Sequence, residues 1–279
     1  MSPKLPPVQA LLAQLMEMAQ QGAPNTCVFV RSHHTCLLRA VDMTHGLIAF
    51  PLRGHKRAFD GEGWLRVDPG EMLVVPNARR VDIENVLDEQ EGCYAAAVVP
   101  ITGRALEAAR ALASGRRNVA TGNIASEPVA PYVAILTDWA QALVEGNEDR
   151  AAYALVGFIL ALAEAGHDGL LQAPLPRLAD RVRDMVAGEP AREWRSLDVE
   201  DALGMSGATL RRRLAEEGTS LRDVTAEARL SHALSLLITT RLPVKSVAAR
   251  AGYASVSSFV KRFSARYGVE PSRVSTAQA

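Results

Sequence analysis

The spacing of hydrophobic residues changes character along the chain. It is helical at residues 8–20, whereas from residue 27 to residue 99 short apolar runs such as CVFV, GLIAF and EMLVVP are separated by polar or glycine-containing breaks. Such interrupted runs are typical of an all-β barrel or sandwich. Asp60 and Gly61, between Phe59 and Trp64, predict a hairpin turn, because glycine tolerates the positive φ that such turns require. Alanine- and leucine-rich stretches then predict helices at residues 102–113, 131–145 and 150–164.

An all-helical region follows the prolines of LQAPLP, Pro174 and Pro176. Because proline interrupts helices, we place a boundary between Gly169 and Pro176 and expect one domain at residues 1–170 and another at 171–279. Serine caps and glycine stops mark the helix ends in the second domain. The expected helices begin at Ser196, Ser206, Leu221, Pro243 and Ser255, and they end near Leu203, Glu217, Thr239, Ala251 and Tyr267, with Gly218, Gly252 and Gly268 as stops.

Two of these helix pairs have a tight turn between their helices, which is the helix-turn-helix arrangement. In the second helix of each pair, leucines or phenylalanines four residues apart face the core: Leu210 with Leu214, and Phe259 with Phe263. Other side chains of these helices then face outward, where they could reach base edges. These are Ala208, Arg211 and Arg212 in the first pair, and Val256, Ser257 and Lys261 in the second. We assign Arg213, Arg262 and Arg266 to phosphate contacts, which set affinity rather than sequence.

A single long helix, expected at residues 221–239, connects the two pairs. At about 1.5 Å per residue it spans roughly 28 Å. Two recognition helices at that separation can enter successive major grooves, which recur every ~34 Å along one face of DNA. One polypeptide could therefore read an asymmetric site of two helical turns, with Arg211 or Arg212 donating two hydrogen bonds to a guanine.

The charge distribution supports an anionic partner for the helical domain. The net charge is zero overall, yet from Ser206 onward the chain has 12 Lys and Arg against 5 Asp and Glu. A basic region of this kind suits double-stranded DNA, although a solvated basic face gives the same excess.

Other functional classes find little support. The apolar stretch at residues 151–163 is too short to span a bilayer and indicates a buried helix, and the N-terminus lacks a secretion signal, so we expect a cytoplasmic protein without membrane contact. The chain has three cysteines, Cys27, Cys36 and Cys93. Because their number is odd and no two of them have a CxxC spacing, we expect free thiols. There is no GxSxG, no Walker loop and no His/Cys/Asp set with recognisable spacing, so we expect neither an enzyme nor a cofactor.

The run from Trp194 through SLDVEDALGMSGATLRRRLAEEGTS, followed by LPVKSVAARAGYASVSSFVKRFSARYGVEP, resembles the tandem helix-turn-helix domain of the AraC/XylS family, over about 100 residues. The tryptophan and the Glu217–Ser220 ending are similar to the subgroup that contains Rns, ToxT and GadX. The resemblance implies a transcription activator that contacts RNA polymerase. It also implies that the six outward side chains named above make the base contacts of this family. Ala208 and Val256 are smaller than the residues of some relatives, which leaves at most van der Waals contact with a thymine methyl.

Gly70, Pro76 and Asn85 fit the second motif of the cupin barrel, which regulators of this family use for effectors. Val81 stands where metal-binding cupins place a histidine, so we expect no metal. Arg31, Arg39, Arg53 and Lys56 lie in or beside predicted strands and could meet an acidic effector inside the barrel, with Arg39 and Arg53 as the named candidates. Solvent-exposed strand faces explain the same residues more simply, because charged residues are mostly exposed. The subgroup resemblance favours a fatty-acid-like carboxylate.

The resulting interpretation is an α+β regulator with an N-terminal cupin-like β-barrel and appended helices, and a C-terminal all-α domain with two helix-turn-helix units. The helices at residues 102–164 favour a homodimer. Three alternatives stay open: control by a protein partner instead of a small effector, a metal-dependent cupin enzyme, and an architectural protein that binds DNA without sequence preference.

Overall fold

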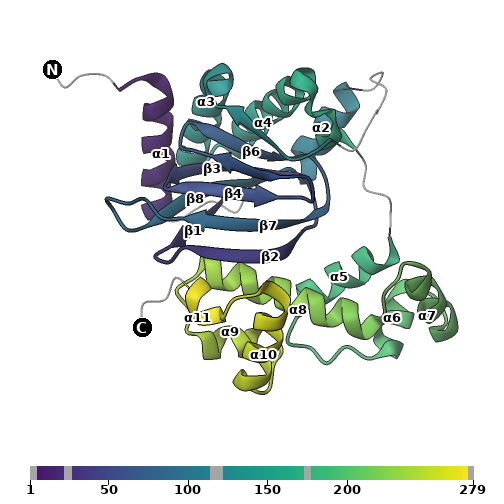
Figure 1. The fold of residues 1–279 in the computed structure, drawn as a ribbon. Helices are drawn as coiled ribbons and strands as arrows, with labels where there is room; N and C mark the ends of the chain where they lie inside the picture. Colours follow the sequence, from purple (N-terminus) through teal and green to yellow (C-terminus); the bar gives the residue numbers. More distant parts are fainter. Residues whose placement is uncertain (1–4, 22–26, 114–121, 173–176, 276–279) are drawn as a thin grey trace. The chain divides into compact units, whose positions relative to one another are not determined.

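The computed structural model describes residues 5–21, 27–113, 122–172 and 177–275. The chain divides into two compact units, Met1–Pro174 and Leu175–Ala279. The first combines strands with helices, and the described part of the second contains helices only (Figure 1). The predicted fold class is therefore confirmed. Pro174 and Pro176, on which the boundary was placed, lie outside the described residues.

Two antiparallel sheets form the cupin-like part of the N-terminal unit. Their strand orders are β1-β8-β3-β6-β9 and β2-β7-β4-β5. Alternate residues of both sheets, among them Ala49, Ala58 and Ile83, pack into one core between them. The hairpin at Asp60 and Gly61 is confirmed, because Phe59 pairs with Trp64 and Gly61 has a φ of 115°. The strands are β1 (Val28–Ser32), β2 (Cys36–Met43), β3 (Leu47–Arg53), β4 (His55–Phe59), β5 (Trp64–Val67), β6 (Glu71–Val75), β7 (Arg79–Val86), β8 (Tyr94–Pro100) and β9 (Ala125–Pro128).

Helices cover the outer face of the five-stranded sheet. Leu15 of α1, Phe50 of β3, and Trp139 and Phe158 of the later helices belong to one hydrophobic cluster. The helices are α1 (Pro7–Gln21), α2 (Gly103–Leu112), α3 (Val133–Val144) and α4 (Glu148–Leu162), with the short turns η1 (Ala130–Tyr132), η2 (Ala163–His167) and η3 (Asp168–Leu171). The segment Glu148–Leu171 is long and apolar enough to cross a membrane by length and composition alone. In this fold Phe158, Ile159 and Leu162 of the segment are buried in the cluster.

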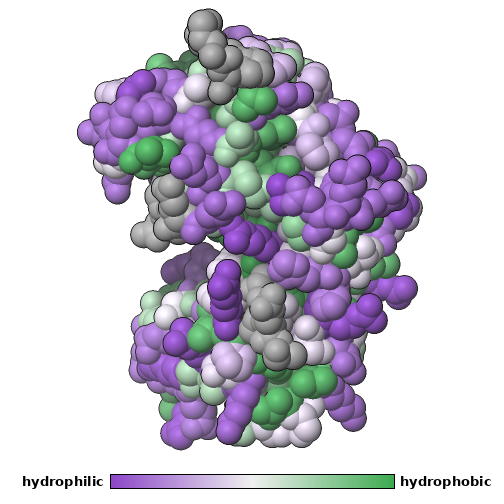
Figure 2. Space-filling model, turned by 90° about the vertical axis from the view of Figure 1, so that its left-hand side faces the viewer, coloured by the Kyte–Doolittle hydropathy of each residue, from purple (hydrophilic) through white to green (hydrophobic). Residues whose placement is uncertain are grey.

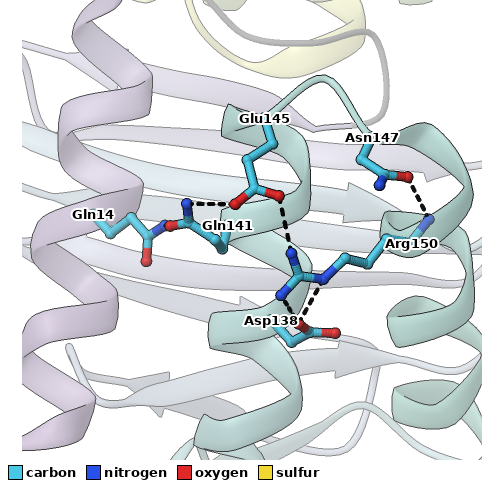
Figure 3. A network of polar contacts seen from close by, with 6 residues as sticks. All are labelled: Gln14, Asp138, Gln141, Glu145, Asn147 and Arg150. Atoms are coloured by element: carbon cyan, nitrogen blue, oxygen red, sulfur yellow. Dashed lines mark hydrogen bonds and ion pairs between the residues drawn. The ribbon is translucent and has the colours of Figure 1, made fainter.

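A polar network on the outside of the unit connects three of these helices (Figure 3). Arg150 of α4 donates from Nε to Oδ1 of Asp138 at 2.9 Å and from Nη1 to Glu145 at 2.9 Å. Glu145 accepts from Gln141, and Gln141 in turn accepts from Gln14 of α1. The network orients the exposed edges of α1, α3 and α4, whose buried sides already pack on the sheet.

The C-terminal unit contains α5 (Leu178–Gly188), α6 (Ser196–Leu203), α7 (Gly207–Glu216), α8 (Leu221–Thr239), α9 (Val244–Arg250), α10 (Val256–Tyr267) and α11 (Pro271–Val274). The expected bounds of α8 are confirmed. The expected cap of α6 is wrong by one residue: Ser196 is its first residue, and the cap is Arg195, whose N–H donates to Oδ2 of Asp198 at 2.8 Å. Pro243 likewise caps α9 instead of lying in its first turn.

Candidate nucleic-acid interface

The first helix-turn-helix unit consists of α6 and α7. Gly204 ends α6 in the left-handed region, with a φ of 63°, which allows the chain to reverse at once. Ser206 then caps α7 by accepting a hydrogen bond from the N–H of Thr209 at 3.3 Å. Leu210 and Leu214 are buried in a cluster with residues of α5, α6 and α8, so the opposite side of α7 faces solvent.

The predicted DNA-contacting residues of α7 are all exposed, yet they differ in their partners. Arg212 donates to Glu216 at 2.7 Å, one helical turn away. Among the described residues, Arg211 and Arg213 have no ion pair, and both can reach an external anion without breaking one. Arg211 is therefore better placed than Arg212 for a base contact, because Arg212 must first give up a surface ion pair worth at most about 1 kcal/mol.

The second unit repeats this arrangement with α9 and α10. Gly252 lies in the turn with a φ of 79°, and Ser255 caps α10 by accepting from the N–H of Ser258 at 3.4 Å. Phe259, Phe263 and Tyr267 form an aromatic stack on the buried side of α10, with ring centroids 5.5 and 4.8 Å apart. The stack fixes the rotation of α10 about its own axis.

Val256, Ser257, Lys261 and Arg262 lie on the exposed side of α10. Val256 is 38% exposed, so its methyl groups are available for an apolar contact. The Oγ of Ser257 is 2.8 Å from the Oγ of the cap Ser255. This hydrogen bond uses part of the hydrogen-bonding capacity of the Ser257 hydroxyl. The guanidinium of Arg266, a predicted phosphate contact, is directed at the ring of Tyr267, 5.1 Å from its centroid, and is half-buried. Of the three predicted phosphate contacts, Arg213, Arg262 and Arg266, the geometry therefore favours Arg266 least.

The two effector candidates of the N-terminal unit lie apart. Arg39 is exposed on β2, and the structure does not bring it to the interior of the sheets. Arg53, at the end of β3, forms an ion pair with Glu91 and lines a pocket of about 310 Å³ with Leu12, Met16 and Leu52. The pocket therefore lies between α1 and the five-stranded sheet, outside the barrel interior.

Of the four strand cations, Lys56 is the one that is buried, whereas Arg31 is half-buried with one buried guanidinium nitrogen. Lys56 is 5% exposed, its Nζ donates to Oδ1 of Asn85 at 2.6 Å, and it lies 5.3 Å from the centroid of the Tyr94 ring. Burial lowers the pKa of Lys56 to about 7. The hydroxyl of Tyr94 is buried and has no hydrogen-bond partner among the described residues, and burial raises its pKa.

No group of three or more His, Cys, Asp or Glu that could hold a metal is found in the described part of the chain. Val81, at the position where metal-binding cupins place a histidine, is buried in the core between the sheets. The three cysteines are free thiols, two of them buried, as the sequence predicts.

Comparison with known proteins assigns the C-terminal unit. Residues 199–277 match the family model described as a helix-turn-helix domain. An uncharacterized HTH-type transcriptional regulator of Mycobacterium tuberculosis is 50% identical over 78 residues, which are 28% of this chain and 23% of that protein. The HTH-type transcriptional regulator GadX of Escherichia coli is 35% identical over 102 residues, 37% of each chain. The chain thus spans 23% and 37% of the length of these two relatives.

The fold of the whole chain is similar to that of ToxT from Vibrio cholerae. An apo ToxT structure superposes with a TM-score of 0.64 at 16% identity, covering 90% of this chain and 97% of ToxT. A structure of wild-type ToxT with bound unsaturated fatty acid gives a TM-score of 0.63, also at 16% identity, and covers 92% and 99%. Together with the capped recognition helices, these findings identify residues 199–277 as a helix-turn-helix domain with two units, in a chain whose two-domain fold is similar to that of ToxT.

Proposed function

We propose that the chain is a sequence-specific DNA-binding transcription regulator, acting as an activator in the bacterial cytoplasm. The observation that carries the proposal is the pair of capped recognition helices, α7 and α10, one before and one after the 19-residue helix α8 in the chain. Each presents exposed basic side chains opposite a buried core. Held in this way, the two helices can enter adjacent major grooves and read an asymmetric site.

Selection of bound sequences from a random DNA pool at about 150 mM salt tests this function. We expect an enriched site with two blocks about one helical turn apart. Binding without enrichment, which disappears as salt rises, would instead favour the architectural alternative, because only the phosphate contacts would then be left.

Replacing Arg211 by alanine should reduce discrimination at one position of the first block. Loss of a bidentate guanine contact costs about 1–3 kcal/mol on the preferred site and less on a site that already carries the wrong base. Arg213→Ala is the matched control on the same helix, since a lost phosphate contact weakens all sequences alike. If fluorescence anisotropy showed that Arg211→Ala loses the same factor of affinity on preferred and on random duplexes, Arg211 would not be a base-contacting residue.

The proposal includes control through the N-terminal unit by a small carboxylate with a hydrocarbon tail. The pocket beside α1 supports it, because Leu12, Met16 and Leu52 give it an apolar wall and Arg53 supplies a cation, although Glu17 and Gln20 also line it. Its volume of about 310 Å³ lies at the lower end of ligand pockets. The fatty-acid-bound ToxT structure adds support by fold. Arg39 has no comparable surroundings, and its role stays a prediction.

Oleate provides the test of this control. We expect oleate to change the DNA affinity of the wild-type chain by about fivefold or more, within the usual range of allosteric coupling. Methyl oleate, which lacks the carboxylate, should have little effect, and Arg53→Ala should blunt the response to oleate. A response to a purified protein partner with none to oleate would favour the alternative mode of control.

A homodimer and contact with RNA polymerase stay predictions of the proposal. Three large hydrophobic side chains of α2–α4 are exposed: Leu112, Val144 and Tyr153. Hydrophobic residues also gather in a band, bordered by hydrophilic ones, on the face of the N-terminal unit seen in Figure 2. Both features suit a protein partner, and sedimentation of the full chain would report the oligomeric state.

A further inference from the structure

A groove of about 750 Å³ runs between the two helix-turn-helix units inside the C-terminal unit. Arg211 of α7 and Arg262 of α10 border it from the two recognition helices, and Arg222 and Arg229 extend into it from the connecting helix α8. Trp194 and Tyr253 complete its walls. We call this feature the arginine groove.

The charge of the arginine groove is uncompensated. None of its lining residues is an Asp or Glu, whereas four are arginines and five carry hydroxyl groups from Ser or Thr. Within the described residues, Arg211, Arg222 and Arg262 form no ion pair with a carboxylate, in contrast to Arg192, which pairs with Asp198 at 3.1 Å. A concave surface with one sign of charge attracts anions.

Arg222 lies where it weakens its own helix. It is the second residue of α8, whose cap is Ser220, so its positive charge is close to the positive end of the helix dipole. Such a position is unfavourable for a cation. Arg222 is exposed and forms no ion pair with a described carboxylate, so a gain in folding stability is a poor explanation for an arginine at this position.

The walls of the arginine groove are held together by contacts within the C-terminal unit. Arg229 donates from Nε to the carbonyl oxygen of Pro190 at 2.9 Å and from Nη2 to that of Arg192 at 2.8 Å. Gly252 packs so closely that a Cβ there would lie 2.4 Å from the Pro190 oxygen. The segment before α6, the middle of α8 and the turn of the second helix-turn-helix unit therefore meet at one point, and these contacts fix the walls of the groove.

We infer that the arginine groove binds the phosphodiester backbone of the DNA segment that lies between the two base-reading blocks, with Arg222 as a principal phosphate contact. The inference rests on the proposed function. When α7 and α10 occupy successive major grooves, the backbone that separates those grooves must pass between the two helices. A groove lined by guanidinium and hydroxyl groups can donate hydrogen bonds to the phosphates of that backbone. Such contacts do not depend on the base sequence.

Arg222→Ala in the full-length chain tests the inference. We expect affinity at ~0.1 M salt to fall about three- to tenfold on the selected site and on random duplex alike, and the slope of log affinity against log salt to decrease in magnitude by about one. The enriched sequence should not change. Arg181→Ala is the matched control, because Arg181 is an exposed arginine of α5 outside the groove; it should bind as the wild type does.

Neutral phosphates locate the contact on the DNA. A methylphosphonate placed between the two blocks should weaken the wild-type chain and have much less effect on Arg222→Ala. The inference is overturned if Arg222→Ala binds DNA with unchanged affinity and salt slope, or if it enriches a different sequence. It is also overturned if the methylphosphonate lowers the DNA affinity of the wild type and of Arg222→Ala by the same factor. In each case an enriched two-block site for the wild-type chain would leave the proposed function standing, whereas a lack of enrichment for the wild type would remove the proposed function itself.

Discussion

Phe263→Ala should unfold the second helix-turn-helix unit and abolish reading of one of the two DNA blocks. Phe263 is fully buried and makes ring contacts with both Phe259 and Tyr267. Truncating such a phenylalanine costs about 3–5 kcal/mol, because it loses apolar burial and leaves a cavity. That is a large fraction of the 5–15 kcal/mol that stabilise a typical domain. Hydrogen exchange of α9 and α10, followed by mass spectrometry, should show the loss of protection directly.

Lys261→Ala is the control for this result. Lys261 lies on the exposed side of the same helix, so its removal should change stability by less than about 0.5 kcal/mol while still weakening DNA binding. Normal protection of α10 in Phe263→Ala would contradict the assignment of the aromatic stack as the core of the second unit.

The stability of the N-terminal unit should rise with pH above neutrality because of Lys56. Burial lowers the pKa of Lys56 to about 7 in the folded chain, whereas an unfolded lysine titrates near about 10.4. Between these values the unfolded state binds the extra proton, so the free energy of unfolding increases with pH. The cost of burying the charge is present in full below pH 7 and is lost as the pH rises toward 10. Relative to Lys56→Met, the wild type should gain about 2 kcal/mol from pH 7 to 9.

Urea unfolding of both proteins at matched ionic strength measures this difference. Lys245→Met, a change at an exposed lysine of α9, should track the wild type over the same range. A difference between wild type and Lys56→Met that stays constant from pH 6 to 9 would show that Lys56 remains charged inside the barrel.

The helices of the C-terminal unit were predictable because their signals are local. Ser206, Ser220 and Ser255 each accept the N–H three residues later, and Gly204 and Gly268 adopt the left-handed conformation that ends a helix. Caps and stops of this kind depend only on neighbouring residues. The strand β9 was not predicted, because ASEP has little β propensity and forms a strand only by pairing with β6.

The candidate sites were predictable only in part. The pairing of Arg212 with Glu216 follows an i, i+4 spacing that is visible in the sequence, so this ion pair is predictable from local spacing. Lys56 is two residues from the buried Ala58, so strand alternation directs it inward, against the usual exposure of lysine. The arginine groove joins Trp194, Arg222 and Arg262, which come from three separate segments. No local pattern brings those residues together.

The spacing between the two blocks of the selected DNA site tests the central claim most directly. Because α8 holds α7 and α10 as parts of one unit, inserting about 5 base pairs, half a helical turn, moves the second block to the opposite face of the DNA. We predict that the affinity for the expanded site falls to that of a single block. A site in which one of the two blocks is inverted should also bind no more tightly than a single block. Unchanged affinity for the expanded site would contradict simultaneous reading of two adjacent major grooves by one chain.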